Sequence, residues 1–195
     1  MNVCELNDIF GDKISKLQPD PDGPVLDAAH LFLRMSLDYC TDAGEPVIGN
    51  FEIPGRNIKI DGYYLDEDNQ EFHILSLLYF DEPSPEQIVT EEQFEIAKEG
   101  VLNFVKQAFQ VTSDVPTSSE LGEMVQELYD DVSAGYSTVV DFFSNVRFPT
   151  DLPTTLIFRS NSMPALYHDA AEISEAIETE DSASHVVLFK KKYGK

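Results

Sequence analysis

Residues 58–80 read IKIDGYYLDEDNQEFHILSLLYF, and the pattern of this run predicts the strands at the centre of the protein. Apolar side chains alternate over residues 58–65, as in a strand that buries one face. The polar segment 66–71, DEDNQE, has the composition of a turn. The almost continuous apolar run over residues 72–80 is typical of a strand that is covered on both faces. We therefore expect a hairpin at the heart of a sheet.

The segments on either side of this hairpin extend the sheet and add helices. Residues 46–53 predict a preceding strand, and the short links between the three strands favour an antiparallel meander. Apolar residues at three-to-four spacing, with a capping box that begins at Thr90, predict several helices. The expected helices cover residues 5–17, 24–43, 90–111, a segment after Pro116, 136–146 and 165–178. The remaining expected strands are 154–160 and 185–190.

Length and composition favour one folded domain with a short appendage. The chain has 195 residues, of which 42% are hydrophobic, which is enough material for a packed core. A Pro/Asp cluster at 19–24 separates an expected N-terminal helical extension, residues 1–23, from a single domain over residues 24–195. The order of elements predicts an α/β or α+β sandwich with a mixed central sheet of about five strands flanked by helices.

The charge of the chain restricts its partners. Against 13 Lys and Arg stand 36 Asp and Glu, so the formal net charge is −23. Such a surface repels phosphate backbones, and we do not expect direct binding to nucleic acid. The acidic helix after Pro116 is either a solvated face or the surface of an inhibitor that mimics DNA. Its acids are Glu120, Glu123, Glu127, Asp130 and Asp131.

The chain lacks the signals of a membrane or secreted protein. No apolar run is long enough to span a bilayer, and the first residues do not form a secretory signal. Cys4 and Cys40 fit no metal-ligand spacing, and reduced thiols are the simplest interpretation. We therefore expect a cytoplasmic protein that does not associate with membranes.

Motifs for metals, nucleophiles and phosphates are also missing from the sequence. The four histidines, His30, His73, His168 and His185, lie far apart and pair with no Cys or His at ligand spacing, so we expect structural histidines and no zinc site. The segment DEDNQE lacks the glycine of a calcium loop, and Glu71 is not at its twelfth position. No nucleophile motif or glycine-rich phosphate loop is present, and we expect no cofactor.

The hairpin does carry one arrangement with known chemistry. An Asp on one strand and an acid-x-Lys triplet on the next resembles the restriction-endonuclease-like superfamily, in which two acids hold Mg²⁺ and a lysine assists the attacking water. With Asp61 as the first acid, the triplet falls on Ser76, Leu77 and Leu78. Ser76 replaces the second acid and Leu78 replaces the lysine, so the motif is degenerate and no catalytic residue is expected.

Three longer stretches narrow this resemblance. They are IDGYYLDEDNQEFHILSLLYFDEPS, VTEEQFEIAKEGVLNFVKQAF and TTLIFRSNSM. Together they resemble the N-terminal region of abortive infection phage resistance (AIPR) proteins, over roughly residues 25–190. The resemblance implies a bacterial antiviral protein with a nuclease-like core and a degenerate site, of which Asp61 alone carries over. Because family members are generally longer, it also implies that this chain is the N-terminal piece of a larger protein.

Three functions follow as hypotheses. The first is a non-catalytic sensor, scaffold or interaction module in phage defence, whose partner is another protein, the C-terminal domains of the same protein or a second copy of the chain. The second is a metal-dependent nuclease with a rearranged site, in which Asp61 binds Mg²⁺, Lys59 shares its strand face and Glu71 lies opposite across the hairpin. The third is the acidic DNA mimic.

Overall fold

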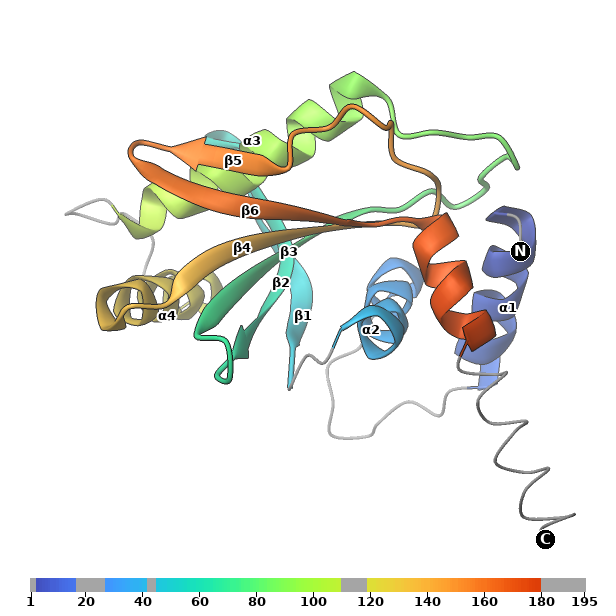
Figure 1. The fold of residues 1–195 in the computed structure, drawn as a ribbon, viewed down its shortest axis with the longest axis horizontal. Coiled ribbons are helices and arrows are strands. Elements are labelled where there is room, and N and C mark those ends of the chain that lie inside the picture. The colour runs from blue at the N-terminus through green and yellow to red at the C-terminus, as the bar shows by residue number, and fades with distance from the viewer. Residues whose placement is uncertain (1–2, 17–26, 42–44, 110–118, 180–195) are drawn as a thin grey trace, which may run out of the picture.

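One mixed sheet runs through the centre of the molecule, and helices cover it (Figure 1). The computed structural model describes residues 3–16, 27–41, 45–109 and 119–179. Within these ranges the strands are β1 (Val47–Ile53), β2 (Ile58–Asp66), β3 (Glu71–Leu78), β4 (Ser137–Ser144), β5 (Thr155–Phe158) and β6 (Asn161–His168). Their order in the sheet is β1-β2-β3-β4-β6-β5. The described part of the sheet therefore has six strands, where the sequence predicted about five.

The helices begin and end near the positions that the sequence predicts. They are α1 (Val3–Lys16), α2 (Ala28–Cys40), the short 3-10 helix η1 (Pro54–Arg56), α3 (Glu91–Ala108), α4 (Glu120–Ala134) and a helical segment over 170–179. The capping box of α3 is confirmed, because the Thr90 side chain accepts from the backbone N–H of Gln93 and the Gln93 side chain accepts from that of Thr90. No helix in the described ranges is long and apolar enough to cross a bilayer.

The strands pair as a meander followed by two parallel additions. β1, β2 and β3 are antiparallel neighbours, which confirms the predicted hairpin and meander. The chain then passes through α3 and α4 before β4 joins β3 in parallel, as a parallel pair requires a long crossover. β6 is parallel to β4, and β5 closes the edge in the antiparallel sense. The predicted α+β class is thus confirmed.

One predicted helix is wrong, and another begins several residues later than predicted. Residues 136–146 contain β4, a central strand, because the buried run TVVDFF lacks the alternation that marks a half-exposed strand. Residues 165–178 contain the end of β6 and most of the helical segment 170–179. Pro164 obscures β6 in the sequence, since proline is rare inside sheets. The predicted strand 185–190 lies outside the described residues.

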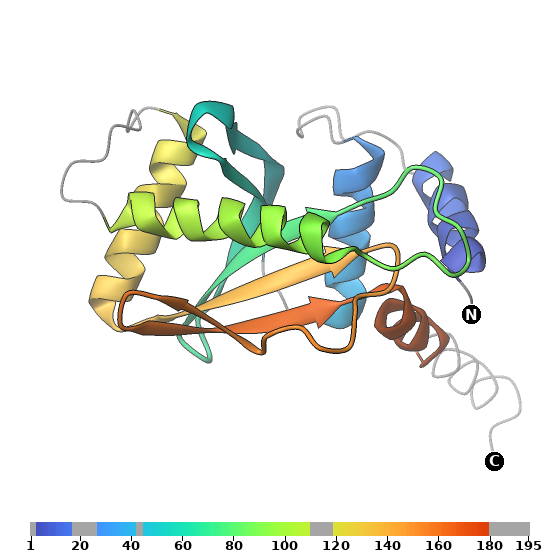
Figure 2. The same cartoon turned by 90° about the horizontal axis from the view of Figure 1, so that it is seen from above.

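Two layers of helices enclose the sheet. On one face, Phe94 of α3 packs against Phe142 of β4 and Tyr167 of β6, with ring centroids 5.2 and 5.9 Å away. On the other side, α1, α2 and the segment 170–179 gather together, away from α4 (Figures 1 and 2). Phe10 of α1 packs against Phe32 of α2 at 4.8 Å, and both are buried. The first helix therefore contributes to the core shared by the whole domain.

Candidate functional site

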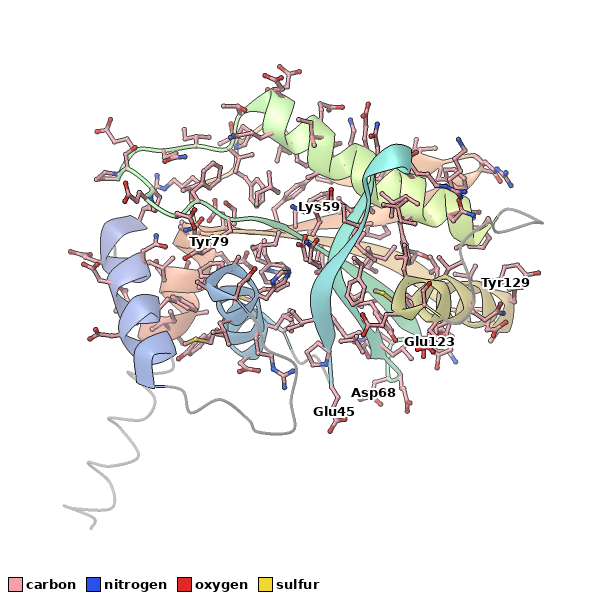
Figure 3. The ribbon with its side chains drawn as sticks, turned by 180° about the vertical axis from the view of Figure 1, so that it is seen from behind. Glu45, Lys59, Asp68, Tyr79, Glu123 and Tyr129 are labelled. Atoms are coloured by element: carbon pink, nitrogen blue, oxygen red, sulfur yellow. The ribbon has the colours of Figure 1, made fainter. Side chains whose placement is uncertain are left out.

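A cavity of about 820 Å³ lies where β1, β2 and β3 meet the start of α2 and the first half of α3. Each of these elements contributes polar side chains to its wall. The polar and charged lining residues are Asp27, His30, Asn50, Glu52, Asn57, Lys59, Asp61, Ser76, Tyr79, Asp81, Gln93 and Glu99. Figure 3 shows two of them, Lys59 beside α3 and Tyr79 beside α2. This volume falls within the range of small-ligand sites, roughly 300–1,000 Å³.

Asp61 is the buried acid of the cavity. Its side chain is 6% exposed, and its Oδ2 accepts a hydrogen bond of 2.7 Å from the backbone N–H of Leu77. A buried carboxylate is costly unless hydrogen bonds or an opposite charge compensate it. The second oxygen, Oδ1, lies 3.6 Å from Nε2 of His30, which supplies such a charge when the imidazole is protonated.

His30 lies between two carboxylates. Asp27 caps α2: its Oδ1 accepts from the backbone N–H of His30 at 2.9 Å and lies 2.8 Å from the imidazole Nδ1. On the far side of the ring stands Asp61. Its proximity raises the pKa of His30 above the usual 6.5, against the opposing effect of burial. Burial by itself would raise the pKa of Asp27, but the hydrogen bond and charge of His30 lower it overall. Asp27, His30 and Asp61 therefore form a row in which the imidazole, when protonated, lies between two carboxylates.

The structure brings together the residues of the predicted degenerate nuclease motif. Ser76 and Leu78 of β3 line the same cavity as Asp61, as the hairpin predicted. Neither side chain supplies a carboxylate or an amine. Of the acids and the lysine that the predicted nuclease motif requires, only the acid Asp61 is present at these positions.

The residues of the predicted rearranged nuclease site do not all lie together. Lys59 lines the cavity with Asp61, as two-residue alternation along β2 predicts. Glu71 instead pairs with Asp66, at the opposite end of β2, and is not a lining residue. The placement of Glu71 opposite Lys59 and Asp61 is therefore wrong, because the register of the hairpin pairs it with the residue that precedes the turn.

The wall of the cavity is strongly acidic. Five of its lining residues are carboxylic acids: Asp27, Glu52, Asp61, Asp81 and Glu99. The lining cations are Lys59 and, when protonated, His30. A wall of this charge attracts cations and hydrogen-bond donors, and repels phosphate groups.

Sequence reasoning missed the role of the first residues of α2. The helix N-cap pattern, an Asp three residues before His30, signals the Asp27–His30 contact. No local signal predicts the contact of His30 with Asp61, because 31 positions separate the two residues and only packing of α2 against the sheet joins them. Two other histidines that the sequence predicted to be structural, His73 and His168, both contact the carboxylate of Asp141.

Four of the five acidic residues of α4 are exposed, and the fifth, Asp131, is half-buried. Glu120, Glu123 and Glu127 are exposed, as is Asp130, while Leu121 and its apolar partners face the core. Figure 3 shows Glu123 on this helix. The helix is amphipathic as predicted, and Glu120, Glu123 and Glu127 line a second cavity together with β1 and with Tyr63 of β2.

These features define the protein as an α+β domain with a mixed sheet and a hairpin that places one buried carboxylate in a ligand-sized cavity. The family model of the abortive infection phage resistance protein N-terminal domain matches residues 32–146, more than half of the chain, and the chain belongs to this family. It is thus a domain of an abortive-infection phage-resistance protein. The match covers the whole meander and β4, whereas Asp27 and His30 lie just before it. No curated protein and no solved structure matches the chain.

Proposed function

We propose that this domain is a non-catalytic, nuclease-like module of the phage-defence protein, which recognises a partner through its acidic cavity and cleaves no nucleic acid. One observation carries the proposal: Ser76 and Leu78 stand beside Asp61 in the cavity. A magnesium-dependent nuclease of this design needs a second carboxylate and a lysine at these two positions. The residues present do not fit that metal site.

The surroundings of Asp61 support the same conclusion. One of its oxygens already accepts from the backbone of Leu77, and the other faces His30. Because the pKa of His30 is raised by Asp61, the imidazole carries positive charge over a wider pH range than a free histidine. An imidazolium beside Asp61 neutralises the carboxylate that would otherwise attract Mg²⁺, and it repels a second cation.

A recognition role suits the remaining chemistry of the cavity. The acidic wall selects for a partner with cationic or donor groups, such as a basic segment of another protein or of the C-terminal part of the same protein. The acids that carry this preference come from separate elements, Glu52 from β1 and Glu99 from α3. Binding there would depend on the relative position of β1 and α3, as the role of a sensor or scaffold requires.

A second candidate is a nuclease with a rearranged site. It is favoured by one observation: Glu52, Glu99 and Lys59 line the same cavity as Asp61. These residues supply the types of group that a metal-dependent hydrolase uses, from other strands and helices than the usual motif. The two candidates differ in whether the domain cleaves nucleic acid.

A cleavage assay distinguishes the two candidates. The purified chain, its Asp61→Ala variant and the control Asp68→Ala are incubated with single- and double-stranded DNA and RNA in Mg²⁺ and in Mn²⁺. Asp68 is an exposed residue of the hairpin turn, so the control removes an acid without touching the cavity. We expect no cleavage by any of the three proteins. Cleavage by the wild type and the control, but not by Asp61→Ala, would refute the non-catalytic role and establish the rearranged nuclease.

A further inference from the structure

The hairpin of β2 and β3 carries a second polar cluster at its turn, distant from the cavity. Asp66 ends β2 and pairs across the hairpin with Glu71, the first residue of β3. His73 follows two positions later and therefore lies on the same face as Glu71. One potential ligand atom from each of these three residues lies within 4.8 Å of the others. Figure 3 shows Asp68 at this turn and Lys59 towards the other end of β2.

The two acids alone would be an ordinary polar turn, but the histidine beside them is buried and incompletely bonded. The side chain of His73 is 6% exposed. Its Nε2 lies 3.3 Å from Oε2 of Glu71, yet makes no hydrogen bond within the part of the chain that the structure describes. A buried ring nitrogen without a hydrogen-bond partner destabilises the fold. The group is aimed at the carboxylates, and a cation between them would satisfy all three.

The other side of the ring is held by the core. Nδ1 of His73 lies 2.6 Å from Oδ2 of the fully buried Asp141, and the ring of Tyr64 stacks on the imidazole at 4.3 Å. With the Nδ1 proton donated to Asp141, the lone pair of His73 is on Nε2. A carboxylate behind the imidazole is the usual outer partner of a histidine that binds metal, since it sets the tautomer and orients the ring.

Asp141 is itself balanced by a second histidine. Nε2 of His168 lies 3.1 Å from its Oδ1. Burial opposes the charging of His168, but Asp141, with Cys40 and Glu172 also close to the ring, raises its pKa to about 11. His168 therefore supplies the positive charge that Asp141 needs.

We propose that Asp66, Glu71 and Nε2 of His73 bind one divalent transition-metal ion, with zinc as the best fit. One imidazole nitrogen and carboxylate oxygens form a donor set that zinc accepts, whereas magnesium and calcium prefer oxygen alone. Ligands held about 2.0–2.2 Å from one zinc ion lie roughly 3–4 Å apart, and the 3.3 Å between His73 and Glu71 is such a separation. The ion would tie the hairpin turn to the buried Asp141 network.

Asp66 is prepared for this role by its own turn. Its Oδ1 accepts from the backbone N–H of Asn69 at 2.9 Å, and its Oδ2 accepts from the Asn69 side chain at 2.8 Å. These hydrogen bonds orient its carboxylate. Each oxygen keeps a further lone pair for a metal ion. The proposed zinc site differs from the sequence prediction of a solvated turn without zinc.

Calorimetry with zinc tests the proposal on the tag-free chain. After treatment with a chelator and dialysis, the protein is titrated with ZnCl₂. We expect one ion per chain. We also expect Glu71→Gln and Asp66→Asn each to weaken zinc binding by at least the roughly 10- to 100-fold that loss of an outer partner of a metal ligand typically costs. Both side chains are partly exposed, so neither substitution disturbs the core.

Glu67→Gln and Asp68→Asn are the matched controls. Each removes one negative charge from the same turn, but neither residue belongs to the cluster. We expect both to bind zinc as the wild type does. In ¹⁵N spectra of the imidazoles, zinc should shift Nε2 of His73 while Nδ1 keeps its proton. The proposal is overturned if no zinc binds, if the controls lose as much affinity as Glu71→Gln, or if zinc perturbs His30 in place of His73.

Discussion

Replacement of Gly100 by alanine tests how closely α3 lies on β2. A Cβ at Gly100 would lie 2.8 Å from the carbonyl oxygen of Lys59 and 3.2 Å from its backbone nitrogen. Strand backbone cannot rotate away as a side chain can, so the helix must move and the packing beside the cavity loosens. Such overpacking costs about 1–3 kcal/mol. Alanine also improves helix propensity by about 0.8–1.0 kcal/mol, which offsets part of this cost.

Gly11→Ala isolates the propensity effect. Gly11 lies in α1, and a Cβ added there would meet nothing within 4 Å. We expect Gly11→Ala to raise the free energy of unfolding by about 0.5–1 kcal/mol. Gly100→Ala should change it by between about zero and −2 kcal/mol. The difference between the two variants is then the overpacking cost itself, about 1–3 kcal/mol.

Urea denaturation of both variants under identical conditions measures this difference. Thermal unfolding provides a second reading, since 1 kcal/mol corresponds to roughly 2–4 °C in a domain of this size. The reasoning would be refuted if Gly100→Ala stabilised the protein as much as Gly11→Ala does. That result would mean that α3 does not touch the backbone of β2 and that the helix packs less closely on the strand beside the cavity.

Two further predictions concern the buried charges. The raised pKa of His30 contributes stability that is fully present below about pH 6.5 and is lost as pH rises through the pKa of the folded state. Asp61→Asn should bring the titration of His30, followed by NMR, back towards 6.5. An unchanged titration would contradict Asp61 as the cause of the raised pKa. Asp141→Asn should lower the free energy of unfolding in urea by about 3–5 kcal/mol because it removes the buried carboxylate that His73 and His168 share, whereas the exposed control Asp151→Asn should stay within about 0.5 kcal/mol; equal effects of the two would contradict the buried pair.

Local pattern was enough for the elements whose signal lies within a few neighbouring residues. The meander follows from alternation over 58–65 and from the polar turn at 66–71, and α3 follows from apolar spacing and the capping box at Thr90. Local pattern failed at β4, where burial on both faces removes the alternation. A continuous apolar run does not distinguish a short helix from a central strand, and only its pairing with β3 and β6 decides it.

The candidate sites divide in the same way. The hairpin predicted that Ser76 and Leu78 would face the position of Asp61, because a strand register transfers local spacing into space. The same register contradicts the predicted position of Glu71, because it pairs Glu71 with Asp66 beside the turn and not with Lys59 or Asp61. The contact of His73 with Asp141 had no sequence signal, because 68 positions separate the two residues.

The amino-acid sequence alone determined the antiparallel meander, the acidic charge of the chain and the lack of an acid and a lysine at the nuclease positions, because these depend on residue type and on neighbours along the chain. Tertiary structure alone decided that β4 is a central strand, that His30 stands beside Asp61, and that His73 faces two carboxylates while Asp141 holds its ring. The contacts of His30 with Asp61 and of His73 with Asp141 join elements that are distant in sequence. Their geometry is set by how α2 packs on the sheet and by the pairing of β3 with β4, which no local spacing encodes.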